Sequence, residues 1–231
     1  MTLTTYEELE QGSPEWLAAR CGIVTASVVG QLITPKTVKP AANDTSRALA
    51  MTLTAERITG YVEPIQPNRD MERGTLSEPF ARDKYAEHYA APYGAPVTEV
   101  GFMVRDFGGY RIGYSPDGLV GDDGLIEIKS PRQKKHLATI LADEVPLENM
   151  AQCQAGLLVS GRDWCDFVSY RGGLPPYVKR VHADPKWAEA IVDAVSAFEQ
   201  RAEEMLHNFD TATKGMPSTE PLTYGVELKL A

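Results

Sequence analysis

The chain has 231 residues, a formal net charge of −9, 43% hydrophobic residues and 24% charged residues. This length supports one substantial core, and the composition is typical of a soluble globular protein. The acidic balance excludes a protein that binds DNA through a generally basic surface, although a local basic patch can still attract nucleic acid.

Nothing in the sequence indicates a membrane or secretory protein. No apolar run approaches the length that spans a bilayer, and the N-terminal segment MTLTTYEELEQ carries acidic residues in place of the apolar core of a signal peptide. The three cysteines, Cys21, Cys153 and Cys165, are an odd number without a CxxC pair or zinc-ligand spacing. We therefore expect reduced thiols and a cytoplasmic protein without a membrane partner.

The first part of the chain is expected to be helical. The expected helices, in chain order, cover 14–20, 25–33, 44–60 and 71–90. Thr25 is suited to begin the second helix, and Asp44 or Thr45 to cap the third, which Gly60 ends. The segment KTVKPAAND (36–44) reads as a loop.

Strands dominate the middle of the chain. Segments 96–104, 110–115 and 124–129 are separated by the turn-forming stretches RDFGG and VGDDG, which predicts an antiparallel meander. A helix over 146–160 then leads to strands near 163–171 and 176–183, completing the list of expected elements up to the final helix.

The final helix is expected to begin with Asp184 as its cap and Pro185 in its first turn. Apolar residues recur in it at helical spacing: Trp187, Ile191, Ala194, Val195 and Phe198. The expected class is α/β (or α+β), a mixed central sheet flanked by helices in one domain. Its core covers about 14–208, and a tail of about 209–231 shows no clear periodicity.

The stretch GYSPDGLVGDDGLIEIKSP carries the most informative chemistry. Side chains alternate along a strand, so Glu127 and Lys129 point to one face while Ile126 and Ile128 point to the other. An alternating strand with a functionally silent exposed face is the plain alternative. The pattern alone leaves both interpretations open.

A second carboxylate strengthens the functional interpretation. Asp117 follows the preceding strand, and a short turn can fold it back against Glu127. Two converging carboxylates form the hard oxygen site that magnesium or manganese prefers. Beside such an ion, Lys129 can hold an attacking water and stabilise charge that develops at phosphorus.

A basic run, KSPRQKKH (129–136), follows directly and contains no acid. Such runs are usually solvated surface. Its position immediately after Glu127 makes a DNA path the sharper hypothesis, with Arg132, Lys134 and Lys135 as the candidate contacts.

The segment SPDGL…GLIEIKSP resembles the PD-(D/E)XK nuclease signature, and specifically the lambda exonuclease type (YqaJ-like viral recombinases). Three further stretches resemble segments of that family in the expected order: WLAARCGIVTAS (16–27), RGTLSEPFAR (73–82) and MAQCQ (150–154). The resemblance covers roughly residues 16–154 and implies a PD-(D/E)XK nuclease-like core.

The resemblance implies roles for individual residues. Those implied as metal ligands are Asp117, Glu127, the backbone carbonyl of Ile128, and Glu78. Lys129 matches the catalytic lysine, and Gln152 matches a glutamine that helps to order the catalytic site. Without the family, Glu78 reads as a solvated helical residue and Gln152 as a surface amide.

Arg20 and Ser27, together with Ser115, match a pocket for a 5′-terminal phosphate. An arginine suits that role because its planar fork can bind a phosphate through two hydrogen bonds. Two features depart from the family pattern. Arg73 stands where the family has a tryptophan, which either adds a contact to the DNA backbone or alters packing, and the loop 34–47 does not match.

The expected function is a magnesium-dependent 5′→3′ exonuclease acting on ends of double-stranded DNA, with two ions and with Mn²⁺ as an alternative. It would release 5′-mononucleotides and leave 3′ single strands for recombination by strand annealing. The resemblance also implies a bacterial or phage-encoded homotrimer and a single-strand annealing protein as partner. Two alternatives stay open: a structure-specific or restriction-type endonuclease, and a non-catalytic DNA-binding module.

Overall fold

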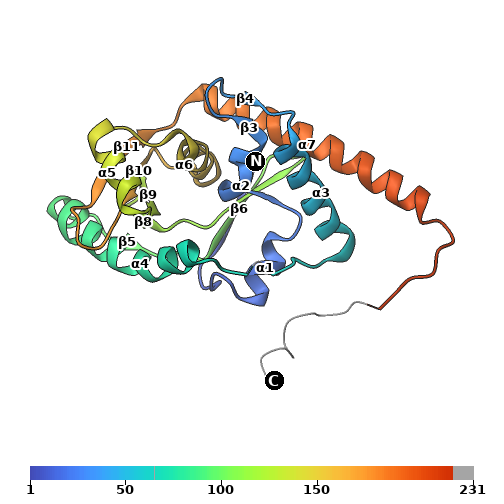
Figure 1. Cartoon of the computed structure of the whole chain (residues 1–231), viewed down its shortest axis with the longest axis horizontal. Helices are drawn as coiled ribbons and strands as arrows, with labels where there is room; N and C mark the ends of the chain where they lie inside the picture. Colours follow the sequence, from blue (N-terminus) through green and yellow to red (C-terminus); the bar gives the residue numbers. More distant parts are fainter. Residues whose placement is uncertain (65, 221–231) are drawn as a thin grey trace.

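The computed structural model describes residues 1–64 and 66–220. Its α-helices are α1 (Pro14–Arg20), α2 (Ala26–Val29), α3 (Asp44–Thr59), α4 (Arg69–Tyr85), α5 (Gln133–Ala142), α6 (Leu147–Ser160) and α7 (Pro185–Ala212) (Figure 1). The expected helices at 14–20, 146–160 and 185 onwards are confirmed. Residues 221–231 of the expected tail lie outside the described part.

The strands form two larger sheets and a short ribbon. One sheet has the order β1 (Thr2–Tyr6), β6 (Phe102–Asp106), β7 (Arg111–Tyr114), β2 (Val24–Thr25). The other has the order β11 (Tyr177–His182), β10 (Trp164–Ser169), β9 (Gly124–Lys129), β8 (Gly118–Val120), β5 (Val97–Thr98). The ribbon pairs β3 (Ile33–Thr34) with β4 (Lys39–Pro40).

Both larger sheets are mixed. The β2–β7 and β9–β10 pairs are parallel, and the neighbouring pairs are antiparallel. Helices lie against these sheets, so the expected mixed α+β class is confirmed. The strands near 163–171 and 176–183 are confirmed as β10 and β11.

The expected three-strand meander is wrong, because the chain changes sheet within it. Segment 96–104 forms β5 and β6, which belong to different sheets. Gly101 permits the change, since a side chain there would meet the backbone of Leu9 and its N–H donates to the carbonyl oxygen of Glu7 at 3.2 Å. As a result β7 pairs with β6, whereas β9 pairs with β8 and β10.

The helix starts differ from the expectation by one or two residues. Asn43, in place of Asp44 or Thr45, caps α3: its side chain accepts from the Ser46 N–H, and the Ser46 hydroxyl accepts from the Asn43 N–H. Gly60 ends α3 in the left-handed conformation, as expected. Asn68 caps α4, and its side chain accepts from the N–H groups of Asp70 and Met71, so that helix begins before residue 71.

Several short elements were not expected. They are β1, β2, β3, β4 and β8, together with α5; the helix expected to reach residue 90 ends at Tyr85 and continues as a π-helical turn over Ala86–Ala90. The expected second helix is reduced to α2 and a 3₁₀ turn over Gly30–Leu32. The start of the basic run 129–136 ends β9, and its second half begins α5. The run therefore forms the connection between β9 and α5 and the first turn of that helix.

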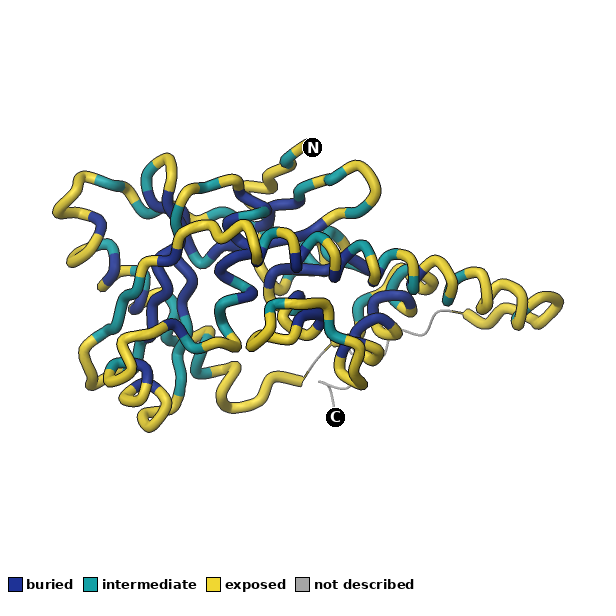
Figure 2. Tube along the Cα trace, turned by 90° about the horizontal axis from the view of Figure 1, so that it is seen from above, coloured by how far each residue is buried: buried dark blue, intermediate teal, exposed yellow. Residues whose placement is uncertain are grey.

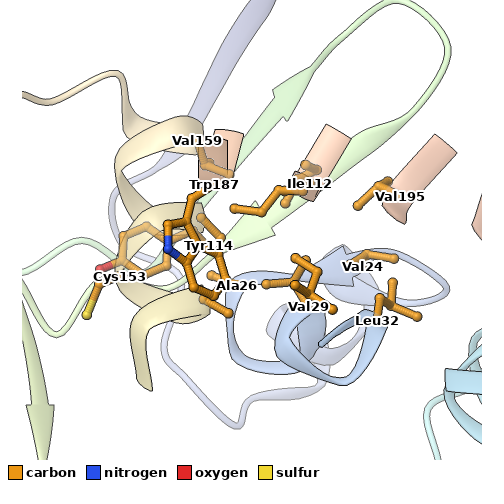
Figure 3. Close-up of a cluster of buried hydrophobic side chains, with 14 of the residues drawn as sticks. Val24, Ala26, Val29, Leu32, Ile112, Tyr114, Cys153, Val159, Trp187 and Val195 are labelled. Atoms are coloured by element: carbon orange, nitrogen blue, oxygen red, sulfur yellow. The ribbon is translucent and has the colours of Figure 1, made fainter. Parts of the chain in front are cut away.

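The main apolar core lies between α6, α7, α3 and the faces of the sheets. Figure 2 shows the buried residues in the interior of the molecule. Figure 3 shows Val24, Ile112 and Tyr114 of the strands together with Trp187 and Val195 of α7. The apolar stripe expected on α7 is buried, as its spacing predicted. Within residues 1–64 and 66–220, no helix is both long and apolar enough to cross a bilayer.

Candidate active site

The two faces of β9 differ in chemistry. Ile126 and Ile128 pack with Ala81 and Tyr85 of α4. On the opposite face, the Lys129 ammonium (Nζ) lies 2.6 Å from Oε1 of Glu127. The predicted alternation along this strand is confirmed.

The Glu127 face is buried, which rules out a silent exposed face on β9. The side chain of Glu127 is 0% exposed. The hydroxyl of Tyr114 on β7 donates to its Oε2 at 3.3 Å. Tyr114 in turn packs against Gly156 of α6, where an added Cβ would lie 2.8 Å from the tyrosine ring. The carboxylate is therefore held between two sheets and a helix.

Asp117 lies in the connection between β7 and β8. The register that pairs Gly118 with Ile126 would place Pro116 opposite Ile128. Proline has no N–H to donate to the Ile128 carbonyl, and the Ile128 N–H donates to the carboxylate of Asp117 at 2.6 Å. The N–H and C=O of a strand residue point to the same side. The Ile128 carbonyl therefore faces the side of Asp117.

Glu78 reaches the same region from α4. It lies one turn before Arg82, whose Nη2 donates to Oε1 of Glu78 at 2.6 Å. Arg82 also donates to the backbone carbonyl of Asp117 at 2.7 Å and pairs with Glu99 at 2.7 Å. Arg82 therefore fixes both Glu78 and the Asp117 turn.

The three carboxyl groups of the site have raised pKa values, chiefly because they are buried. Burial, with a smaller contribution from Asp117, raises the pKa of Glu127 to about 7, although Lys129 opposes the shift. Burial also raises the pKa of Asp117, and burial followed by the charge of Asp117 raises the pKa of Glu78 to about 7. Burial alone would lower the pKa of Lys129, but the charges of Glu127 and Asp117 raise it.

This donor set fits a divalent cation. Two carboxylates and a backbone carbonyl are hard oxygen ligands, and a 2+ ion would stabilise the ionised form of carboxylates whose pKa values burial raises. Among the described residues, no three His, Cys, Asp or Glu side chains come close enough to hold an ion on their own. Such a site suits Mg²⁺, which usually keeps several waters and takes few protein ligands.

Two of the implied phosphate-pocket residues, Arg20 and Ser115, contact Trp16. Its indole Nε1 donates to Oγ of Ser115 at 2.9 Å, and the guanidinium carbon of Arg20 lies 4.3 Å from its ring centroid. Burial lowers the pKa of Arg20, against the charge of Glu56.

Ser27 lies at the start of α2, directly after β2. Its hydroxyl lies 3.0 Å from that of Thr25, and Thr25 pairs with Gly113 in the parallel β2–β7 ladder. Ser27 and Ser115 therefore each lie two residues beyond a paired position. Both lie at the end of the ladder that leads into Asp117.

Gln152 is not connected to this cluster by a side-chain hydrogen bond within the described residues. It is half-buried on α6. The glutamine that makes contacts is Gln154, which donates to the His182 carbonyl at 2.9 Å and accepts from the Asp184 N–H at 2.9 Å. The role implied for Gln152 stays a prediction.

The predicted DNA contacts lie at the start of α5. Arg132 and Lys135 each pair with an acid, Arg132 with Asp70 at 2.9 Å and Lys135 with Glu148 at 2.8 Å. Lys134 is exposed. The run therefore carries ordered cations, and its contact with DNA stays a prediction.

Three residues of the region had no predicted role: Trp16, Arg82 and Tyr114. Trp16 and Arg82 stand inside the quoted motifs, and Arg82 follows Glu78 at the i, i+4 spacing of helical ion pairs. From that spacing, the contact between Arg82 and Glu78 could have been predicted. Tyr114 had none, because its contact with Glu127 joins two sheets whose relation the sequence does not reveal.

The model of the YqaJ-like viral recombinase domain matches residues 15–163, more than half of the chain. The chain belongs to this family. The sequence resemblance drawn from the four motifs is thereby confirmed.

Solved structures agree with the family. An alkaline exonuclease (LHK-Exo) from Laribacter hongkongensis is 35% identical, with 89% of this chain and 100% of that chain covered and a TM-score of 0.77. LHK-Exo in complex with dAMP matches at 36% identity with the same coverage and TM-score. A phage-related exonuclease from Haemophilus somnus 129PT, at 14% identity and a TM-score of 0.63, shares the fold over 81% of this chain and 96% of that one. No curated protein matches the sequence.

Proposed function

We propose that this YqaJ-family protein is a magnesium-dependent exodeoxyribonuclease. It degrades double-stranded DNA from 5′ ends, releases 5′-mononucleotides and leaves 3′ single strands for strand annealing. The observation that carries the proposal is the buried cluster of Asp117, Glu127 and Lys129, next to the group formed by Arg20 and Ser115. The similarity to an alkaline exonuclease over 89% of the chain supports the same activity.

Asp117, Glu127 and the carbonyl of Ile128 would hold the metal, with Glu78 near it. When bound, the ion would acidify a water and offset charge on the phosphate. The chain's own part is to keep these oxygens fixed in a site from which most water is excluded. There electrostatic interactions are stronger than in bulk water.

Lys129 acts on the reacting groups directly. Its ammonium is fixed by Glu127 at 2.6 Å, and its raised pKa keeps it charged at neutral pH. It can donate hydrogen bonds to the attacking water and to a non-bridging phosphate oxygen. A preorganised charge aimed at the developing negative charge lowers the barrier without reorganisation during the reaction.

Arg20, Ser27 and Ser115 give the enzyme its polarity. A 5′-terminal phosphate is a dianion, which an internal phosphodiester does not present. Arg20 is held by Trp16, and that indole also fixes Ser115, two residues before Asp117. A 5′ end bound there places the first internucleotide linkage towards Asp117 and Lys129, so digestion runs 5′→3′.

The proposal includes one exonuclease domain, a homotrimer that encircles DNA, and an annealing protein as partner. The family resemblance supports these three points. A ring with acidic residues outside and basic residues inside would reconcile the net charge of −9 with a DNA substrate.

The test is digestion of three DNAs in Mg²⁺: linear duplex with 5′-phosphate, the same duplex with 5′-hydroxyl, and covalently closed circular duplex. We expect mononucleotides from the first, a slower reaction on the second and no reaction on the third. Efficient cutting of the circle would favour the endonuclease alternative. Binding without any hydrolysis would favour a non-catalytic DNA-binding module.

A further inference from the structure

A basic pocket of about 490 Å³ lies beside the candidate active site. Its charged lining comes from three separate segments: Arg69, Asp70 and Arg73 at the start of α4, Arg132 and Lys134 at the start of α5, and Arg171 after β10. Five of these side chains are cations and one is an anion. The pocket therefore suits a polyanion and lacks the carboxylates of a metal site.

Asp70 organises two of the cations. Its Oδ1 accepts from Arg73 Nη1 at 2.5 Å and from Arg132 Nε at 3.1 Å, and its Oδ2 lies 2.9 Å from Arg132 Nη2. The hydrogen bonds from Arg132 and Arg73 lower the pKa of Asp70 to about 2, so it stays ionised. One carboxylate thus orders two guanidinium groups and leaves a net positive charge facing the pocket.

Arg73 joins the pocket to the catalytic strand. Its Nη2 and Nε donate to the carbonyl oxygen of Ser130 at 3.0 and 3.3 Å. Ser130 directly follows Lys129. The pocket therefore begins one residue beyond the proposed catalytic lysine, and Arg73 is the residue that replaces the family's tryptophan.

The N-terminus of α5 adds backbone donors. This ten-residue helix begins at Gln133, and its cap residue Arg132 makes no side-chain capping hydrogen bond. The first N–H groups of a helix have no partner within the helix and favour anions. Because Gln133 and Lys134 line the pocket, these donors lie next to the ordered arginines.

We propose that the basic pocket binds backbone phosphates of the cut DNA strand on the 3′ side of the scissile bond. This inference rests on the proposed exonuclease function and extends it with a second phosphate-binding site. Ser115 and Arg20 hold the 5′ end, Lys129 lies at the scissile linkage, and the pocket after Ser130 receives the phosphates that follow. Figure 1 shows α1 and α5 well apart, as a strand crossing the site requires.

The pocket also explains how the next linkage reaches the site after each cut. Ordered cations hold phosphates without reading bases, because charged contacts to the backbone carry no sequence information. A strand held in this way can advance by one nucleotide at a time. The site would therefore lower the release of DNA between cuts, whatever the sequence.

The experiment replaces single phosphodiesters by neutral methylphosphonates. Blunt duplexes with a 5′-phosphate carry one replacement at the third or fourth linkage of the cut strand, or at the matching positions of the complementary strand. Binding is measured in EDTA, so that no hydrolysis occurs. The proteins are wild type, Arg132→Gln and Arg73→Gln, with Arg47→Gln as matched control. Arg47 also pairs with an aspartate, Asp44, but on α3, which lies well apart from α5 (Figure 1).

For wild type, we expect a neutral linkage in the cut strand to weaken binding by about tenfold, the usual size of one hydrogen bond to a charged group. Arg132→Gln should lose a similar factor on native DNA and nothing more on the neutral linkage. Arg132 is 77% exposed, so the variant should fold normally. Arg47→Gln should behave as wild type.

The inference is overturned if the neutral linkage costs Arg132→Gln and Arg73→Gln as much as it costs wild type. It is also overturned if the coupling appears only with the complementary strand. Digestion of native duplex by wild type in Mg²⁺ is measured in parallel. Loss of digestion by wild type would contradict the proposed function, whereas normal digestion without coupling would contradict the pocket alone.

Discussion

Both faces of β9 are largely enclosed, yet they contribute unequally to the free energy of unfolding. Ile126 and Ile128 pack behind the strand against α4, and burying such side chains stabilises a fold by about 25 cal/mol per Å². Glu127 and Lys129 lie in front of it, where the desolvation of two charges offsets their attraction. Stability and the proposed catalysis are therefore separable on one strand, because they depend on alternate residues.

The largest effect is expected from removal of a carboxylate on the charged face. Asp117→Ala or Glu127→Ala should abolish Mg²⁺-supported digestion and weaken metal binding, because each removes a proposed ligand, while duplex binding survives. Nucleotide release and metal titration measure the two effects. Metal binding equal to wild type in both variants would contradict the assignment of the ligands.

The apolar face should give the reverse result. Ile126→Ala is expected to lower the free energy of unfolding by about 2–5 kcal/mol, because it leaves a cavity between β9 and α4. Urea unfolding measures this cost. The folded fraction should digest DNA within a few-fold of wild type. A loss of turnover as large as that of Asp117→Ala would show that the two faces are not separable.

Arg20→Ala is expected to change the digestion rate of one substrate, the 5′-phosphorylated duplex. Wild type should prefer 5′-phosphate over 5′-hydroxyl ends by about one to two orders of magnitude, given roughly 1.5–3 kcal/mol for a charged hydrogen bond. The variant should slow only the phosphorylated duplex. Rates on the two ends, with Arg47→Ala as control, measure the preference. If the preference for 5′-phosphate persists in Arg20→Ala, the 5′-phosphate binds at a site that does not include Arg20.

The smallest effect concerns pH and stability. The pKa of Glu127 in the folded chain is about 7, above its ordinary 4.5, so the folded state binds more protons between these values. Stability from this group is present at low pH and is lost as the pH rises through about 7. Mg²⁺ competes with these protons. It should therefore raise Tm by a few degrees at pH 8 and by less at pH 5.5.

Glu127→Gln is the control for this pH effect. Its Tm without metal should change less than that of wild type between pH 5.5 and pH 8, because Glu127, one of the two carboxyl groups with a pKa of about 7, is gone. Thermal unfolding at the two pH values, with and without Mg²⁺, gives the comparison. An equal pH dependence in both proteins would assign the effect to other groups.

Local patterns predicted much of the fold. The apolar spacing of α7, the alternation along β9 and the cap at Asp184 depend on neighbours within a few residues, and sequence displays these directly. The change of sheet at Gly101 was missed because it depends on a contact with Leu9, far away in the chain. The same applies to α5, whose basic residues concealed a helix that buries His136 and Thr139.

The candidate site divides in the same way. The proximity of Glu127 and Lys129 followed from strand geometry, and the position of Asp117 followed from a short turn. The contacts of Tyr114 and Trp16 could not be predicted, since each joins segments that only the tertiary fold brings together. Arg82 was within reach of prediction through its spacing from Glu78.

The most direct measurement of the central claim is single-turnover digestion of 5′-phosphorylated linear duplex by Lys129→Ala. The account predicts a folded protein that binds Mg²⁺ nearly as wild type does, because the lysine is not a ligand, and that releases nucleotides about 10²–10³-fold more slowly or worse. Near wild-type nucleotide release by this variant would contradict the assignment of the charged face of β9 as the nuclease centre.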